Sequence, residues 1–402
     1  MATAATIALI GGTALAAGLC LRPKVLRSRS WRATVTPLAS IIGSGFLVVG
    51  PILADTAGSW AWLAMVALCS IGYLYGAAIR QNILFIQPHL HELPAGAAQI
   101  EQLSDLALAL SYFISVAYYL NLFAAFGLRI AGIEDPGAIR IVATVAIAII
   151  GAIGFRGGLA ALERLEVGAV GIKLSVIGGL LASLAVAYGL AITHHSTLSA
   201  PGNKSPLQAL QIILGLVILV QGFETSRYLG EKYDAATRQR TMRRAQWISS
   251  AIYLLFVFML THLFRDDLKP IGGETQIIDM LRPLSAAAAP LLIIAALASQ
   301  SSAAIADMNG AGGLLKEATG KRIPVALGNL ATAMVAIAIT WSADIFEIIT
   351  YASKAFVGYY GLQSFQAARS SWDHRSYGRT VLFAGGVVLA VCIIIFAVPA
   401  DA

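Results

Sequence analysis

Charged residues are scarce in this chain of 402 residues, of which Asp, Glu, Lys and Arg together make up 12%. Soluble globular proteins contain roughly 25% charged residues, and no stretch here is long and polar enough to form a separate soluble domain. Hydrophobic residues make up 58% of the chain. Apolar runs of roughly 20 residues, each long enough to cross a ~30 Å hydrocarbon core, recur along its whole length. The sequence therefore predicts an integral, multi-pass, all-α membrane protein.

Cysteine is also rare, and the scattered residues Cys20, Cys69 and Cys392 have neither disulfide-framework nor metal-ligand spacing. The cluster HisLeuHisGlu at 89–92 has no further ligand pair nearby and fits a loop better than a metal site. The sequence contains no nucleotide-binding loop, nucleophile elbow or zinc motif. We therefore expect no enzyme activity, no cofactor and no metal ion.

Acidic residues are outnumbered by basic ones, which gives a net charge of +7. In a membrane protein such an excess is typical of cytoplasmic loops and does not require a nucleic-acid partner. The basic residues gather in alternate loops, at 22–32, 231–246, 321–322 and 369–379. The apolar run 2–21 has its positive charge after it, so we expect a retained helix with the N-terminus outside. We expect the inner (cytoplasmic) membrane of a bacterium.

The apolar runs predict about twelve transmembrane helices. After the extra N-terminal helix, the expected spans lie near 34–54, 58–79, 106–128, 139–155, 167–190, 207–228, 246–264, 284–305, 323–341, 344–366 and 380–398. Loop charge gives helices one to five and helices six to ten opposite topologies, which is typical of an inverted repeat. The expected domains are the extra helix and basic linker (1–32), the first repeat (33–190), the second repeat (207–366) and a C-terminal helix (367–402).

Two corresponding spans contain residues that interrupt a helix. The span 34–54 carries GlySerGly at 43–45, and the span 207–228 carries Gly215 and GlnGlyPheGluThrSer at 221–226. Paired interruptions of this kind in two halves indicate the binding site of a transporter, although small residues also allow close helix packing. Freed N–H groups attract a carboxylate, and freed carbonyl groups coordinate a cation.

Four motifs, in this order, resemble those of the amino acid–polyamine–organocation (APC) transporter superfamily. They are IleIleGlySerGlyPheLeuValValGlyPro (41–51), LeuProAlaGlyAlaAlaGlnIle (93–100), GlnGlyPheGlu (221–224) and LeuLeuLysGluAlaThrGlyLysArgIlePro (314–324). The resemblance covers residues 33–370 and implies a five-plus-five inverted-repeat fold with discontinuous helices one and six. It also implies a secondary active transporter that moves a small organic solute, such as an amino acid or related amine, by alternating access.

The resemblance places the substrate between helices one, three, six, eight and ten. By matched motif, the substrate-binding residues are Ser40, Gly43, Ser44, Gly45, Gln221, Gly222 and Phe223. In helix three, Tyr118 or Tyr119 is a further candidate, with packing as the alternative role. The chain departs from the family pattern at Val220, where an aromatic residue is usual, and at Ala97, where a second Gly is usual. An inorganic-ion carrier or channel on the same fold therefore stays an alternative, as does a non-transporting subunit that docks a partner on loop 231–246.

Ionisable residues inside a span are functional candidates because burying them is costly. Lys173 lies within helix five, where some proton-coupled members of the resembled family have a lysine in place of a bound sodium ion. We expect it to couple transport to a proton in preference to sodium, with Ser301 and Ser302 in the same pocket. The alternative is that Lys173 extends its amine to the headgroups.

Four further charges are candidates for gates or intramembrane ion pairs. Glu224 and Asp307 lie near the ends of their spans, with Arg227 or loop arginines as expected partners, or they are simple interfacial charges. Glu347 and Lys354 are seven residues apart, so we expect them to share one helix face toward the bundle. The expected partners of the protein are thus a small-molecule substrate, a proton and the lipid bilayer, and the sequence does not determine an oligomeric state.

Overall fold

The computed structural model describes residues 2–43, 45–92, 94–156, 166–192, 202, 204–230, 232–264 and 273–401. Within these ranges the regular structure is entirely helical. Among the described helical segments, nine are long and apolar enough to cross a membrane. The prediction of an all-α, multi-pass membrane protein is confirmed, whereas the two-fold repeat stays a prediction.

The first half of the chain contains eight α-helices in the described ranges. They are α1 (Ala2–Cys20), α2 (Pro23–Arg27), α3 (Arg29–Ile41), α4 (Gly45–Ala57), α5 (Ala61–Phe85), α6 (Ala95–Leu128), α7 (Pro136–Phe155) and α9 (Glu166–Ile192). Short 3-10 helices η1 (Gly58–Trp60), η2 (Gln87–Glu92) and η3 (Arg129–Ala131) lie between them. The expected helix one is thus two helices, α3 and α4, separated at the predicted GlySerGly.

The second half begins with α10 (Pro206–Leu214), which ends well before the expected end of helix six. It continues as η4 (Val217–Val220) and η5 (Phe223–Leu229), and then as α11 (Ala235–Leu263), α12 (Gln276–Leu281), α13 (Ala288–Ala318), α14 (Val325–Ser342), α15 (Ile345–Asp373) and α16 (Tyr377–Phe396). Helices α6 and α11 each begin about ten residues before the apolar run that predicted them. The residues that precede each apolar run include several polar ones, such as Glu101 on α6 and Arg240 on α11, and they continue the same helix without having to lie in hydrocarbon.

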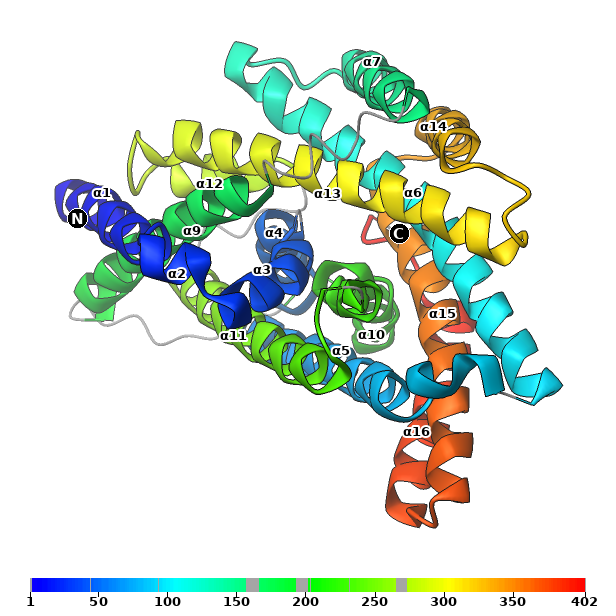
Figure 1. Ribbon diagram of the computed structural model, residues 1–402. Helices are drawn as coiled ribbons and strands as arrows, with labels where there is room; N and C mark the ends of the chain where they lie inside the picture. The colour runs from blue at the N-terminus through cyan, green and yellow to red at the C-terminus, as the bar shows by residue number, and fades with distance from the viewer. Residues whose placement is uncertain are drawn as a thin grey trace.

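The interrupted helices lie in the middle of the bundle. Figure 1 shows α3, α4 and α10 at the centre, with α5, α6, α9, α11, α13 and α15 around them. Helices α7 and α14 pack together on the outside, and α16 packs against α15. The freed backbone groups of the central helices are therefore surrounded by protein, which is the condition for interrupting a helix at membrane depth.

The extra N-terminal helix α1 packs lengthwise against α9. Small residues allow this contact, because a side-chain carbon at Gly179 would lie 2.5 Å from the carbonyl oxygen of Leu9. The opposite face of α1 carries the exposed side chains Ile7 and Leu15. Helix α1 is therefore bound to the same helix that carries Lys173.

Candidate substrate and coupling site

The two helix interruptions pack directly against each other. A side-chain carbon at Gly45 would lie 2.8 Å from both Cα and the carbonyl oxygen of Leu219, and one at Gly222 would lie 2.5 Å from Oγ of Ser40. Gly222 also has a φ of +114°, a conformation that strains any other residue. Glycine is thus required at both places by close approach of the chain to itself, and a role for these glycines in ligand binding stays a prediction.

Tyr253 on α11 bonds to freed carbonyl groups of both interruptions. Its hydroxyl lies 2.9 Å from the carbonyl oxygen of Ile41 and 2.7 Å from that of Leu219. Both oxygens are acceptors, so the single hydroxyl proton is shared between them. One buried side chain therefore connects the end of α3 to η4.

Ser353 on α15 replaces helix hydrogen bonds of the second interruption. Its Oγ accepts a hydrogen bond from the backbone N–H of Ile218 at 2.9 Å and donates one to the carbonyl oxygen of Gly215 at 2.6 Å. A serine hydroxyl can do both at once. The turn between α10 and η4 is thereby held open without leaving these two buried backbone groups unpaired.

Glu224 acts in the same way on the following turn. Its carboxylate is buried and accepts hydrogen bonds from the backbone N–H of Gly222 at 3.0 Å and from the hydroxyl of Tyr360 at 2.8 Å. The neighbouring Phe223 ring stacks on Tyr360, with ring centroids 5.1 Å apart. Glu224 therefore stabilises the interruption itself, and its expected ion pair with Arg227 is absent from the ion pairs of the described residues.

Lys173 reaches the first interruption from α9. Its side chain is buried, and Nζ donates to the carbonyl oxygen of Ala39 at 2.8 Å and to Oγ of Ser299 at 3.1 Å. Ala39 lies in the last turn of α3, where carbonyl groups lose their helical partners and the helix dipole is negative. The ammonium group thus joins α9, α3 and α13 and does not extend to the headgroups.

Gln300 lies beside this contact without a hydrogen-bond partner. The residue is completely buried, and neither its side-chain oxygen nor its nitrogen bonds to another described residue. Together with Gly43, Phe46, Lys173 and Ser299 it lines a narrow cavity of about 10 Å³. A cavity of that size holds about one water molecule, so the protein is closed around this site.

The serines expected beside Lys173 are not the ones that contact it. Ser301 donates to the carbonyl oxygen of Leu297 within its own helix, and both Ser301 and Ser302 are half-buried. The serine that contacts Lys173 is Ser299. Positions 299 and 301 are about 200° apart around a helix, so only one of them faces α9.

Of the two candidate tyrosines on α6, Tyr119 is the one that contacts both interruptions. Its hydroxyl lies 3.1 Å from Nε2 of Gln221 and 3.9 Å from the position of a side-chain carbon at Gly43. Tyr118 is also buried and packs against Tyr119, with ring centroids 5.2 Å apart. Ser44, expected at the centre of the site, lies outside the described residues.

The remaining intramembrane charges have structural roles. Asp307 is buried and accepts a hydrogen bond from Ser115, which joins α13 to α6. Glu347 and Asp344 form a capping box at the start of α15, and Glu347 is half-buried, so its orientation toward the bundle stays a prediction. Lys354, two turns further along α15, is half-buried.

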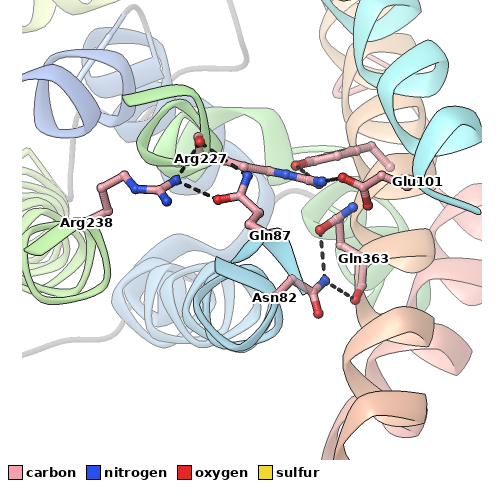
Figure 2. Close-up of polar contacts among 7 residues, drawn as sticks. Asn82, Gln87, Glu101, Arg227, Arg238 and Gln363 are labelled. Carbon is pink, nitrogen blue, oxygen red and sulfur yellow. Dashed lines mark hydrogen bonds and ion pairs between the residues drawn. The ribbon is translucent and has the colours of Figure 1, made fainter. Parts of the chain in front are cut away.

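Arg227 is the centre of a polar network at one end of the bundle (Figure 2). Its guanidinium pairs with the buried carboxylate of Glu101 on α6. Its carbonyl oxygen accepts hydrogen bonds from Arg238 at 2.8 Å and from Gln87 at 3.3 Å. A separate contact in the same view, from Asn82 to Gln363, joins α5 to α15. Segments α6, η2, α11 and α15 thus all contact Arg227 of η5.

Comparisons with known proteins agree with this architecture. A family model described as an APC superfamily transporter matches residues 23–397. An uncharacterized protein of Aquifex aeolicus (strain VF5) is 39% identical over 385 residues, which is 94% of this chain and 93% of that protein. A solved structure of a sodium-coupled sialic acid symporter, in a substrate-bound outward-open state, has a TM-score of 0.52 and 14% identity, with 98% of each chain covered. This chain belongs to the APC superfamily of transporters.

Proposed function

We propose that the protein is a secondary active transporter that moves a small organic solute, an amino acid or a related amine, by alternating access. The observation that best supports this proposal is that two interrupted helices face each other at the centre of the bundle, with their freed backbone groups bonded to side chains. Such side-chain bonds can be exchanged for bonds to a ligand, whereas a continuous helix offers no free backbone groups.

The proposed substrate site lies along this contact. The start of α4, at Gly45, presents backbone N–H groups and the positive end of the helix dipole to a carboxylate, and Gly43 lies just before it. Gln221, Gly222 and Phe223 supply the opposite wall, and Ser40 lies against Gly222. A substrate amine would replace the hydroxyl proton of Tyr253 as the partner of the freed carbonyl groups. Because the cavity is closed here, binding requires α3 and α4 to move away from η4.

Lys173 is the proposed coupling residue. As an ammonium group it is attracted to the carbonyl oxygen of Ala39 and to the negative end of the α3 dipole, and it holds α3 against α9 and α13. Loss of the proton removes this charge and weakens the hold, so α3 is free to move.

The test begins with a panel of proteinogenic amino acids and polyamines. A solute that binds the native state at about 100 times its Kd raises the free energy of unfolding by about 2.7 kcal/mol, which a thermal scan detects. The strongest hit is then radiolabelled and its uptake measured in proteoliposomes with an imposed pH gradient. We expect uptake to follow the pH gradient and to be independent of sodium.

Lys173→Ala separates coupling from folding and binding. The variant should lose gradient-driven uptake yet retain exchange of labelled for unlabelled solute, and Lys24→Ala on the exposed helix α2 should behave like the wild type. Gradient-driven uptake by Lys173→Ala would contradict the proposed coupling. Sodium-driven uptake would instead indicate that sodium is the coupling ion, as in the sodium-coupled sialic acid symporter of similar fold. Ion flux without any organic solute would favour an ion carrier on the same fold.

A further inference from the structure

A second cavity lies away from the interrupted helices, between the start of α3 and the first turns of α11. Its volume is about 250 Å³. Three arginines and three hydroxyl residues line it: Arg29, Ser30, Thr237, Arg240, Thr241 and Arg244. Among the described residues, no carboxylate contributes to this lining. The cavity is therefore strongly positive and rich in hydrogen-bond donors.

Each guanidinium group is held in place by a neutral acceptor. The bonds run from Arg29 Nη2 to the carbonyl oxygen of Lys232 at 3.2 Å, from Arg240 Nε to that of Ala236 at 3.2 Å, and from Arg244 Nη1 to Oγ of Ser30 at 2.8 Å. Each arginine has five N–H donors, so most remain for another partner. None of the three takes part in an ion pair between described residues.

The acidic residue beside the cavity, Asp234, is engaged elsewhere. Its carboxylate accepts hydrogen bonds from the hydroxyl and the backbone N–H of Thr237, at 2.7 and 2.8 Å, and so caps α11. These two bonds hold the pKa of Asp234 below its usual range. The carboxylate is thus ionised at neutral pH. Its oxygens bond to the helix end, and it also attracts Arg240, so one negative charge offsets only part of the three positive charges.

The cavity lies at the expected depth of the lipid headgroups. Trp247, which is 62% exposed, follows Arg244 by three residues, or about one helical turn. Exposed tryptophans are enriched at the membrane–water interface. Helix α11 has 29 residues and is therefore about 44 Å long, which exceeds the ~30 Å hydrocarbon core. Its arginine-bearing first turns extend beyond that core.

We propose that this cavity binds a phosphate group, supplied either by the headgroup of an anionic lipid or by phosphate in solution. The planar guanidinium fork matches the oxygens of a phosphate, and the hydroxyl groups of Ser30 and Thr241 add further contacts. A phosphate bound here would relieve the repulsion among three like charges. It would also tie the start of α3, half of the interrupted helix, to α11.

The experiment measures ligand-induced stabilisation of the full chain in detergent. The probes are phosphatidylglycerol, phosphatidylcholine as the zwitterionic comparison, and inorganic phosphate. The cavity variant is Arg29→Gln/Arg240→Gln/Arg244→Gln. The matched control is Lys24→Gln/Arg27→Gln/Arg243→Gln, which removes the same charge from the same helices and their surroundings without touching the lining.

We expect phosphatidylglycerol to raise the melting temperature of the wild type and of the control, and to bind the cavity variant at least about tenfold more weakly. Stabilisation by phosphatidylglycerol alone assigns the cavity to a lipid headgroup, and stabilisation by inorganic phosphate as well assigns it to soluble phosphate. Equal loss in both triple variants, or no stabilisation of the wild type by either probe, overturns the proposal. If the cavity variant does not fold, Arg240→Gln against Arg243→Gln gives the same comparison.

Discussion

Replacing Tyr253 with Phe removes one oxygen atom from the centre of the bundle. The hydroxyl bonds to Ile41 and Leu219 across the two interruptions, and the ring stays in place because Phe fills the same volume. The change therefore leaves two buried carbonyl groups without their described partner. No water from the membrane interior is available to replace it.

The expected cost follows from the number of bonds. Leaving a buried acceptor without its partner costs about 1–3 kcal/mol. The two carbonyl groups share one hydroxyl proton, so we expect a loss of about 1–3 kcal/mol in total and not for each carbonyl group. The free energy of unfolding, measured by titration with a denaturing detergent, should fall by about that amount. Crosslinks between α3 and η4 should also form less efficiently, since the hydroxyl is one of the contacts that hold these segments together.

Tyr75→Phe is the matched control. Tyr75 is equally buried, but its hydroxyl lies 3.4 Å from the carbonyl oxygen of Gly386, near the limit of a hydrogen bond. We expect this variant to lose less than about 1 kcal/mol. If Tyr253→Phe is as stable as the wild type, or no less stable than Tyr75→Phe, the idea that side chains sustain the interruptions is refuted.

Three further changes test neighbouring contacts. Gly45→Ala should lower the free energy of unfolding by about 1–3 kcal/mol in a detergent titration, because its side-chain carbon would overlap the backbone of Leu219. Glu101→Gln should cost about 3–5 kcal/mol by leaving the Arg227 charge buried and unpaired, and a double-mutant cycle with Arg227→Gln should show strong coupling. Glu347→Ala should cost about 1 kcal/mol through the lost capping box while solute exchange in proteoliposomes is unchanged, whereas impaired exchange would restore a transport role.

The positions of the interruptions were predictable from the sequence because glycine destabilises a helix and permits close approach and positive φ. Gly43, Gly45 and Gly222 lie where the chain approaches another backbone closely or adopts a positive φ. Hydropathy likewise located the nine described helices that are long and apolar enough to cross a membrane, since the bilayer demands a minimum apolar length, and the count of about twelve spans stays a prediction. Both signals are local, and they do not depend on how the helices are arranged.

The side chains that hold the interruptions open were not predictable in the same way. Tyr253, Ser353 and Ser299 are single polar residues within apolar runs, and many other residues match that description. Which of them faces a freed carbonyl depends on the rotation of each helix, and one residue turns a helix by about 100°. The sequence alone does not give that angle, so it does not distinguish Ser299 from Ser301 as the contact of Lys173. A charge near a helix start, such as Glu347, can cap the helix, and hydropathy does not reveal this role.

The arrangement of these bonds suggests how the site can open without exposing bare backbone. The freed groups of α3 are held from α9 by Lys173 and from α11 by Tyr253, and those after α10 are held from α15 by Ser353. Two of these three contacts act on the carbonyl end of α3, and only the one from Lys173 carries a charge that a proton can switch. Under the proposed coupling, loss of that proton weakens the contacts of Lys173 with α3 and α13 and leaves those of Tyr253 and Ser353 intact, so the turn after α10 keeps its geometry.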